Sequence, residues 1–388
     1  MMHIFLNGLA ASAGGGLTYL RNVVPQLSAT RDAHTTVALS PQLRHELQDL
    51  PNVSFLETPI PDGSARRFWH EQTVLPQLIR KSGANALLSA GNFALWRSPV
   101  PQILLSRNSL YLSDDFYRDL RVRRDYRLWT DTQLKGFLAK RSVQWADCTV
   151  APSRAFAEEL KHWTGKNVTA IHHGFDHDAF FRDKMPLLPV VEQKLGADAG
   201  ALRLLFVSHY NYYRNFETLF RAMPLIREGL NGRKVKLFLT CALRSAEIPG
   251  GYRAESAVTL LEQLGIVENV VELGAIPYSQ LHHVYQACDI YVTPAYVESF
   301  AHPLVEAMAS GLPVVASRLP VHREICGEAA LYFSPFSAKE LAQEVLRVGL
   351  SKDLAQDLAT RGTARAQDFS WRRHVDQIVE LASSLTPG

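Results

Sequence analysis

The chain has 388 residues, of which 47% are hydrophobic, and a formal net charge of +3. This length predicts two domains that each bury a core, and so small a net charge gives no reason to expect a nucleic-acid partner. The four cysteines are scattered and form no C-x-x-C pair, which predicts free thiols in a reducing cytoplasm and no structural metal site.

The N-terminal residues MMHIFLNGLAASAG predict a first strand rather than a secretory signal. A basic region is missing, and Asn7 and Gly8 interrupt the apolar run. No stretch reaches the roughly 18 to 20 uninterrupted apolar residues of a membrane span. We therefore expect a cytoplasmic protein that at most contacts the inner face of a membrane.

Short aliphatic and β-branched runs alternate with amphipathic segments of helix length, which is typical of βαβ units and parallel sheets. The runs lie at residues 3–7, 35–39, 86–90, 102–106, 148–152, 168–173, 203–208, 235–240, 270–274, 289–294, 313–317 and 330–334. The predicted fold class is α/β, with about six strands in each of two open domains.

The alternation pauses between residues 174 and 200, where prolines, glycines and charged residues collect. We therefore predict an N-terminal domain over residues 1–180, a linker over 181–200 and a C-terminal domain over 201–370. Ligands of such domains bind beyond the carboxyl ends of the strands, where helices begin.

The stretch ESFAHPLVEAMASGLPVVAS, residues 298–317, places two glutamates at such an edge. Pro303 fits the first position of a helix, so Glu298 is expected in the preceding loop and Glu306 in the first helical turn. Backbone N–H groups at the helix start predict an anion site. A nucleotide diphosphate would offer phosphate to these amides and ribose hydroxyls to Glu306. If the two glutamates stood alone, a simpler interpretation would apply: Glu306 favours the positive end of the helix, and Glu298 is an exposed loop residue.

The same stretch resembles the E-x7-E block of the retaining family-4 glycosyltransferases, which have the GT-B fold. Further segments resemble that family in the same order along nearly the whole chain: GGGLTYLRNVVPQL, APSRAFAEEL, IHHGFDHDAF, VSHYNYYRNFETLFRAM, VVELGAIPYSQLHHVYQACDIYVTPA and DFSWRRHVDQIVEL. The resemblance implies two Rossmann-like domains that face each other across a cleft. It also implies that a C-terminal helix, at residues 371–388, crosses back onto the N-terminal domain.

The resemblance further implies metal-independent transfer of a hexosyl group from a nucleotide diphosphate sugar, with retention and without a cofactor. GDP-mannose or a UDP-sugar is the expected donor. The expected acceptor is a glycan or lipid-linked saccharide, in surface polysaccharide biosynthesis. A nucleotide-sugar epimerase of the same fold and a non-catalytic nucleotide-sugar-binding module remain alternatives.

Three residues are carried over from the family as catalytic: Glu298, Arg214 and His209. Arg214 stands where the family has a phosphate-binding lysine, and a guanidinium serves phosphate at least as well. His209 replaces the family's usual arginine. It is mostly neutral near pH 7 unless a diphosphate raises its pKa, so it would donate a neutral hydrogen bond or leave the site weaker.

The donor site implied by the resemblance is built mainly from backbone groups. Ser299 and Ala301 stand where the family commonly has glycines. The glycines between the first strand and the first helix would allow close approach of a diphosphate. They do not complete the G-x-G-x-x-G fingerprint of dinucleotide-binding proteins, because Tyr19 occupies the position of its third glycine. The expected donor-binding residues are Glu306, Ser299, Phe300, Ala301, Gly274, Ile276, Gly15 and Gly16.

Arg107 and Asn108 follow the strand 102–106 where many relatives have a sugar-contacting histidine, so we expect them to contact acceptor or sugar. His302 is either a helix cap or a sugar contact. The arginine-rich helical stretch 114–141 is either a membrane-contacting face or a solvated face balanced by aspartates. The histidines within 172–178 and at 282–283 lack metal-ligand spacing, and no metal site is expected.

Overall fold

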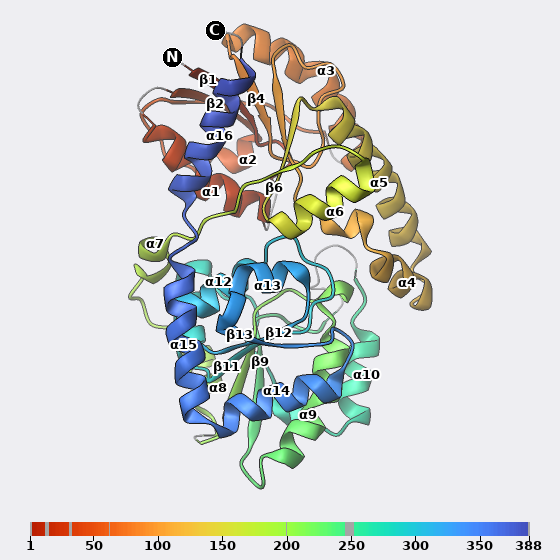
Figure 1. Cartoon of the computed structure of the whole chain (residues 1–388), viewed down its shortest axis with the longest axis vertical. Coiled ribbons are helices and arrows are strands. Elements are labelled where there is room, and N and C mark those ends of the chain that lie inside the picture. Colours follow the sequence, from red (N-terminus) through yellow and green to blue (C-terminus); the bar gives the residue numbers. More distant parts are fainter. Residues whose placement is uncertain are drawn as a thin grey trace. The chain divides into compact units, whose positions relative to one another are not determined.

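The computed structural model of the chain describes residues 2–11, 15–30, 33–61, 63–198, 200–244 and 252–386. It divides into two compact units (Figure 1). The first comprises Met1–Asp114, Leu120–Gly174 and Ser370–Gly388; the second comprises Asp115–Asp119 and Phe175–Phe369. Residues 181–200, expected as a linker, belong to the second unit and include a helix, α8 (Pro189–Gly196).

The first unit contains a seven-stranded parallel sheet in the order β3-β2-β1-β4-β5-β6-β7. Val53–Glu57, an edge strand, was not predicted from the sequence; it is short, and none of its residues is buried. The strands are β1 (Met2–Asn7), β2 (Ala33–Leu39), β3 (Val53–Glu57), β4 (Ala86–Ser89), β5 (Gln102–Leu105), β6 (Cys148–Ala151) and β7 (Thr169–Ala170).

Helices pack on this sheet through aliphatic faces. They are α1 (Gly15–Ser28), α2 (Pro41–Arg44), α3 (Ser64–Ser82), α5 (Tyr126–Trp145), α6 (Arg154–Thr164) and α16 (Trp371–Leu385), with a 3₁₀ turn η1 (Ser109–Leu112). Helix α4 (Asp114–Val122) is divided between the units, and its residues 115–119 belong to the second. Side chains of Ser153 and Ser370 accept backbone N–H groups at the starts of α6 and α16, as serines at these positions commonly do.

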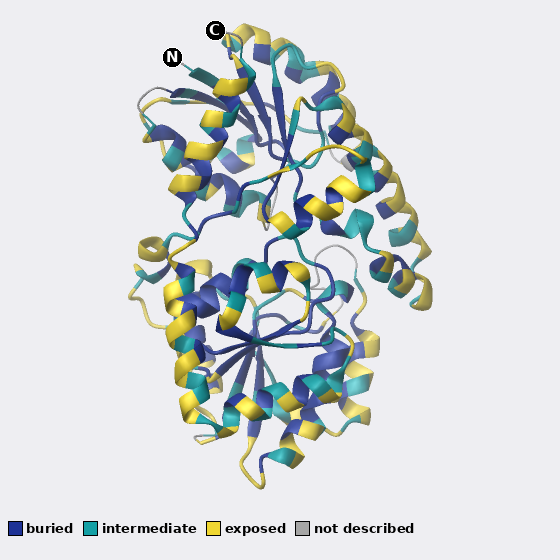
Figure 2. Ribbon diagram, viewed as in Figure 1, coloured by how far each residue is buried: buried dark blue, intermediate teal, exposed yellow. Residues whose placement is uncertain are grey.

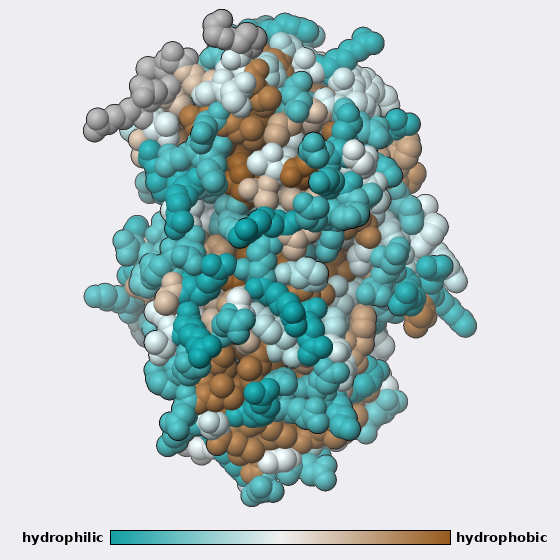
Figure 3. Space-filling view, in the orientation of Figure 1, coloured by the Kyte–Doolittle hydropathy of each residue, from teal (hydrophilic) through white to brown (hydrophobic). Residues whose placement is uncertain are grey.

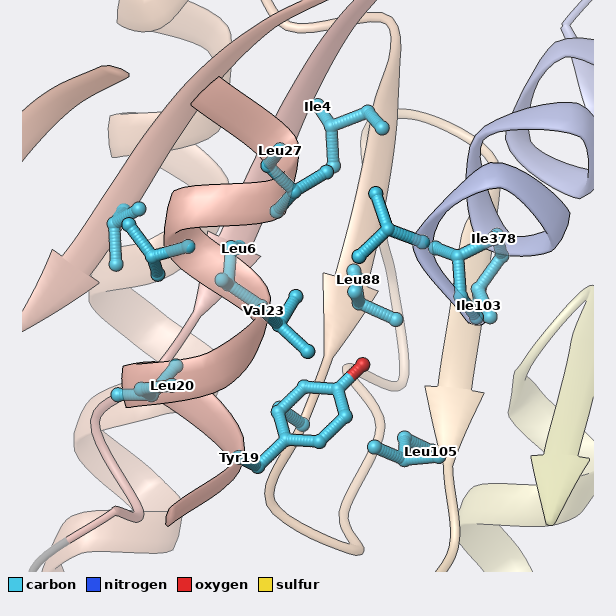
Figure 4. Close-up of a cluster of buried hydrophobic side chains, with 14 of the residues drawn as sticks. Ile4, Leu6, Tyr19, Leu20, Val23, Leu27, Leu88, Ile103, Leu105 and Ile378 are labelled. Atoms are coloured by element: carbon cyan, nitrogen blue, oxygen red, sulfur yellow. The ribbon is translucent and has the colours of Figure 1, made fainter. Parts of the chain in front are cut away.

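The C-terminal helix α16 returns to the first unit, as the sequence predicts. Ile378 of α16 shares one buried cluster with Ile103 of β5 and side chains of α1 (Figure 4). His374 Nδ1 lies 2.9 Å from the carbonyl oxygen of His172, and its Nε2 lies 3.0 Å from the Tyr19 hydroxyl. Burial lowers the His374 pKa to about 4, so the neutral ring donates to the carbonyl and accepts from Tyr19.

The second unit contains a six-stranded parallel sheet in the order β10-β9-β8-β11-β12-β13. Its strands are β8 (Leu202–Phe206), β9 (Val235–Leu239), β10 (Val270–Glu272), β11 (Ile290–Thr293), β12 (Val314–Ser317) and β13 (Ala330–Phe333). In Figure 2 the strands are mainly buried whereas the helices expose one side, as expected for a parallel sheet covered on both faces.

The helices and 3₁₀ turns of the second unit are short to medium in length. They are α7 (His177–Phe181), α8, η2 (Tyr212–Arg214), α9 (Phe216–Gly229), α10 (Glu255–Gln263), η5 (Val267–Asn269), η6 (Tyr278–Gln280), α11 (Leu281–Gln286), α12 (His302–Ala309), α13 (Pro320–Cys326), η7 (Gly327–Ala329), α14 (Ala338–Leu350) and α15 (Lys352–Ala366). Among the described residues, no helix combines the length and apolar character needed to cross a membrane.

Each sheet has one point where the strand order reverses. In the first unit the chain proceeds outward from β1 through β2 and β3 and then crosses to β4 on the other side of β1. In the second it proceeds from β8 through β9 and β10 and crosses to β11. Loops diverge at such points, so the carboxyl ends of β1 and β4, and of β8 and β11, are where ligands of these folds bind.

The return of α16 requires a glycine at position 174. A Cβ atom there would lie 1.9 Å from the backbone nitrogen of Trp371. We expect Gly174→Ala to lower the free energy of unfolding by roughly 1–3 kcal/mol, because the backbone of the α16 start must shift. Chemical denaturation measures this loss. Gly196→Ala is the matched control because a Cβ atom added there would have no neighbour within 4 Å, and equal loss in both variants would contradict the prediction.

Candidate functional site

An ion pair joins the two loops at the reversal point of the second sheet. Arg214, at the end of η2 after β8, donates from Nη1 to Oε2 of Glu298, which lies between β11 and α12. The two side chains are 19% and 12% exposed. Because β8 and β11 are neighbours in the sheet, residues 84 positions apart in the chain meet.

The Arg214 guanidinium is fully charged despite its burial. Burial lowers its pKa, but the charge of Glu298, supported by nearby tyrosines, outweighs that effect and raises the pKa overall. Its buried Nε has no hydrogen-bond acceptor among the residues that the structure describes. The guanidinium therefore keeps donor capacity beyond the contact with Glu298.

Glu306 lies deeper and is held by tyrosines. It is the fifth residue of α12, so the expectation of a place in the first turn is wrong; the helix begins at His302, and Pro303 occupies its second position. The Tyr285 hydroxyl donates to Oε2 at 2.9 Å, and Tyr278 also hydrogen-bonds the carboxyl. Burial raises the Glu306 pKa to about 7 although both tyrosine contacts lower it.

The loop before α12 has an unusual backbone. Ala301 adopts the left-handed conformation, with φ of 68°, at a position where the resemblance leads one to expect glycine. The Ser299 N–H donates to Oε1 of Glu298 at 3.3 Å, so this amide already has an acceptor. Phe300 is buried and its ring lies 4.8 Å from that of His302 and 5.6 Å from that of Phe369, which indicates packing by its side chain.

His209 is exposed in the loop between β8 and η2. Its carbonyl oxygen accepts a hydrogen bond from the Ser208 hydroxyl at 2.8 Å. Its ring has no hydrogen bond to any residue that the structure describes. The structure therefore leaves this imidazole accessible and does not join it to Arg214 or Glu298.

The segment after β10 supplies Gly274 and Ile276. Gly274 has φ of 81°, a conformation that favours glycine, and Ile276 is half-buried. Tyr278, which hydrogen-bonds Glu306, follows two residues later in η6. The hydrogen bond from Tyr278 thus connects the segment after β10 with Glu306.

Sequence reasoning missed the side chains that surround the two glutamates. Besides Tyr278 and Tyr285, His322 of α13 is buried, with Nδ1 2.9 Å from the carbonyl oxygen of Ser317. Burial lowers the pKa of His322 to about 4, against the opposing charge of Glu298. No local pattern marks these residues, because their roles depend on which elements pack together.

In the first unit, Arg107 holds the start of α1. Its Nη1 donates to the Gly15 carbonyl at 2.8 Å and its Nη2 to that of Ala90 at 2.6 Å. A Cβ atom on Gly16 would lie 3.0 Å from Cα of Ala11, so this glycine allows the helix to start close to the loop after β1. Gly14, the first glycine of the run, lies outside the described residues.

The loop after β4 orients Arg107 and Asn108. The Asn92 Oδ1 accepts both of their backbone N–H groups, at 2.6 and 3.1 Å. The Asn108 side chain in turn accepts the Leu110 N–H at 3.1 Å and caps η1. Asn108 thus has a local structural role, and the acceptor or sugar contact expected from the sequence stays a prediction.

The described residues contain no group of three or more His, Cys, Asp and Glu side chains placed to hold a metal ion. The histidines within 172–178 pack instead of clustering around a common point: the His173 ring lies 5.3 Å from that of Trp371.

Two family models match this chain in succession. The model described as Glycosyltransferase Family 4 matches residues 13–179, and that described as Glycosyl transferases group 1 matches residues 190–365. The chain belongs to the family-4 glycosyltransferases. The fold of the chain and its E-x7-E block agree with that assignment.

Curated relatives of this chain align over parts of their length. The O-antigen chain mannosyltransferase B of Escherichia coli is 32% identical over 37% of this chain and 38% of its own length. A D-inositol 3-phosphate glycosyltransferase of Corynebacterium jeikeium is 33% identical over 36% of this chain and 33% of its own length. The alignments thus span about a third of the length of each of these two relatives.

Solved structures share the fold of this chain over nearly its full length. Sucrose-phosphate synthase from Thermosynechococcus elongatus has a TM-score of 0.77 at 20% identity, covering 99% of each chain. Anabaena Alr3699/HepE in complex with UDP-glucose has a TM-score of 0.72 at 20% identity, covering 99% of this chain and 100% of the other.

The burial of Glu306 predicts a pH-dependent stability. Its pKa is about 7 in the folded chain and near its ordinary value of 4.5 in the unfolded chain. Between these pH values the folded state binds the extra proton, so the contribution of Glu306 to the free energy of unfolding falls as pH rises, by up to about 3 kcal/mol, whereas the buried neutral His322 and His374 contribute with the opposite sign. We expect Glu306→Gln to abolish this fall.

Chemical denaturation of both proteins at pH 5 and pH 8 measures the difference. Glu192→Gln, an exposed glutamate of α8, is the control and should follow the wild type. Equal pH dependence in Glu306→Gln and the wild type would show that the buried carboxyl does not titrate in this range.

Proposed function

We propose that this chain is a retaining glycosyltransferase that moves a hexosyl group from a nucleotide diphosphate sugar to a saccharide or lipid-linked saccharide. The second unit binds the donor and the first binds the acceptor. The observation that carries this proposal is the placement of Arg214, Glu298 and Glu306 around the reversal point of the second sheet. A cation for phosphate and two carboxylates for hydroxyls match the two chemistries of such a donor.

The Arg214 guanidinium would stabilise the leaving diphosphate. When the bond between the anomeric carbon and the phosphate oxygen breaks, negative charge grows on the diphosphate, and a preorganised cation lowers the energy of that state. The phosphate can replace Glu298 as the partner of Arg214, which frees the Glu298 carboxylate for the sugar. His209, exposed in the adjacent loop, would donate one further hydrogen bond to phosphate.

Retention follows if the acceptor attacks the same face from which the diphosphate departs. The acceptor oxygen forms the new bond to the anomeric carbon, and the leaving phosphate oxygen takes the acceptor proton. This route needs neither a protein nucleophile nor a metal ion or cofactor, since the leaving group itself serves as base. We therefore propose that activity persists in the presence of a metal chelator.

The Glu306 carboxylate would accept hydrogen bonds from the ribose hydroxyls. The backbone at Ser299, Phe300 and Ala301 would contact the diphosphate, and the turn at Gly274 and Ile276 would contact the base. The mannosyltransferase relative and the UDP-glucose complex of a structural neighbour support a hexosyl donor, and our proposed donor is GDP-mannose or a UDP-sugar. The O-antigen relative also supports a role in surface polysaccharide biosynthesis.

Nucleotide binding tests this proposal directly. A titration of UDP, GDP, dTDP and ADP should show one preferred diphosphate, with binding about five- to tenfold tighter at pH 8 than at pH 6 because ribose hydroxyls favour the ionised Glu306. Glu306→Gln should lose the part of this pH dependence that exceeds titration of the phosphate itself. In turnover, it should raise the donor KM more than it lowers kcat.

No binding of any diphosphate would contradict the donor site. Conversion of the nucleotide sugar without an acceptor would identify an epimerase, and binding without turnover for any saccharide acceptor would favour a non-catalytic module.

We also propose that α5 contacts an anionic membrane surface. Tyr126, Leu134 and Phe137 are 61%, 64% and 60% exposed, on the side of α5 opposite its buried residues. The Arg141 guanidinium lies 5.5 Å from the Phe137 ring centroid, so charge and apolar surface adjoin. Such a face suits the interface of an anionic bilayer. On the molecular face in Figure 3, hydrophilic and hydrophobic side chains are mixed.

Vesicle sedimentation should show binding to phosphatidylglycerol vesicles that exceeds binding to phosphatidylcholine vesicles and falls at least threefold in Leu134→Ser/Phe137→Ser. Val267→Ser, which changes an exposed apolar residue of the second unit, is the control. Equal sedimentation with both lipids, or none, would identify α5 as a solvated face.

A further inference from the structure

A small pocket lies at the reversal point of the first sheet. Its volume is about 220 Å³, and its wall includes residues that follow β1, β4 and β5, such as Ala10, Gly91 and Arg107. Arg67 of α3 and Lys135 of α5 complete the wall. The pocket thus occupies the position where this type of sheet binds ligands.

The pocket wall carries three cations, and no aspartate or glutamate is among its described lining residues. Arg107 is held by two backbone carbonyls, and its buried Nε has no acceptor in the part of the chain that the structure describes. Confining several positive charges that carboxylates compensate only in part is unfavourable, so a bound anion would stabilise this arrangement.

The carboxylates nearest to these cations compensate them only in part. Arg67 Nε lies 3.7 Å from Oε1 of Glu71, which is a long contact. Burial raises the pKa of Glu71, which favours the neutral carboxyl. Lys135 Nζ lies 2.7 Å from Asp131, but that carboxylate, whose charge also acts on Tyr111 of the pocket wall, is 49% exposed. Water screens such an exposed pair, and its net contribution is small.

The size of the pocket limits which part of a ligand can enter it. At 220 Å³ it is smaller than the roughly 300–1,000 Å³ of sites that enclose a whole drug-sized ligand. A phosphate monoester carries up to two negative charges and three accepting oxygens, which match several cations better than one carboxylate does. The rest of the ligand would extend out of the pocket.

We propose that this pocket binds a phosphate group of the acceptor, so that the substrate accepting the sugar is a phosphorylated saccharide or polyol, or a lipid-linked saccharide phosphate. This inference rests on the proposed function, in which the first unit binds the acceptor. Arg67 and Lys135 contact the phosphate oxygens, and Arg107 contributes through its charge while it holds Gly15.

Calorimetric titration with inorganic phosphate, glucose 6-phosphate, glucose and farnesyl diphosphate tests the proposal in the full chain, without donor. We expect binding of glucose 6-phosphate and phosphate but not of glucose. Tighter binding of the prenyl diphosphate than of glucose 6-phosphate would assign the phosphate to a lipid carrier, and the reverse order would assign it to a soluble acceptor.

Two variants and two matched controls localise the site. Arg67→Gln and Lys135→Met should each weaken phosphate-ligand binding at least fivefold. Arg66→Gln, at the exposed neighbouring position, and Lys140→Met, on the same helix outside the pocket wall, should not. Thermal melts establish that the variants are folded. Because Lys135 does not contact Glu71, weaker binding in both variants would not be explained by loss of the Arg67–Glu71 contact.

A UDP or GDP titration on the same samples separates this proposal from the proposed function. Unchanged nucleotide affinity in Arg67→Gln, with weakened glucose 6-phosphate binding, supports an acceptor phosphate site. Equal weakening of both ligands, or displacement of glucose 6-phosphate by the nucleotide, would make the pocket part of the donor site and overturn it. Equal binding of glucose and glucose 6-phosphate would also overturn it, whatever the nucleotide titration shows.

Discussion

The contact between Arg214 and Glu298 ties together the loops after β8 and β11, and the geometry of the donor-side site depends on it. Both side chains are largely removed from water, so removing one partner would leave an uncompensated charge, at a cost of about 3–5 kcal/mol. A diphosphate offers Arg214 a second anionic partner. A donor can therefore rearrange the pair without leaving either charge alone in the interior.

Glu306 adds a second electrostatic constraint, which differs from the first because hydroxyl groups and not a cation hold this carboxyl. Its carboxyl has no cation among its described hydrogen-bond partners; it is held by the hydroxyls of Tyr278 and Tyr285, and burial keeps its pKa near 7. Near neutral pH this group is thus poised between its two forms, and a ligand that donates hydrogen bonds favours the charged one. The tyrosines orient the carboxyl in either form.

The two units use the same sheet topology with different charge arrangements. At the reversal point of the second sheet, a cation is matched by a carboxylate within hydrogen-bonding reach. At that of the first, Arg107 is matched by backbone carbonyls, and Arg67 and Lys135 have distant or exposed partners. Parallel strands thus present a ligand-binding edge in both units, whereas the side chains at the loop ends decide which charge that edge accepts.

The sequence alone determined the α/β class, most strands, the loop position of Glu298 and the return of the C-terminal helix, because these follow from periodicity, turn residues and the family resemblance. It did not reveal β3, a short edge strand in which no residue is buried. It also placed Glu306 too early in its helix. Only the tertiary structure decided that Arg214 pairs with Glu298, that two tyrosines hydrogen-bond Glu306, and that Arg107 donates to the Gly15 carbonyl. These contacts join residues far apart in the chain, and strand order and packing, which no local spacing encodes, bring them together.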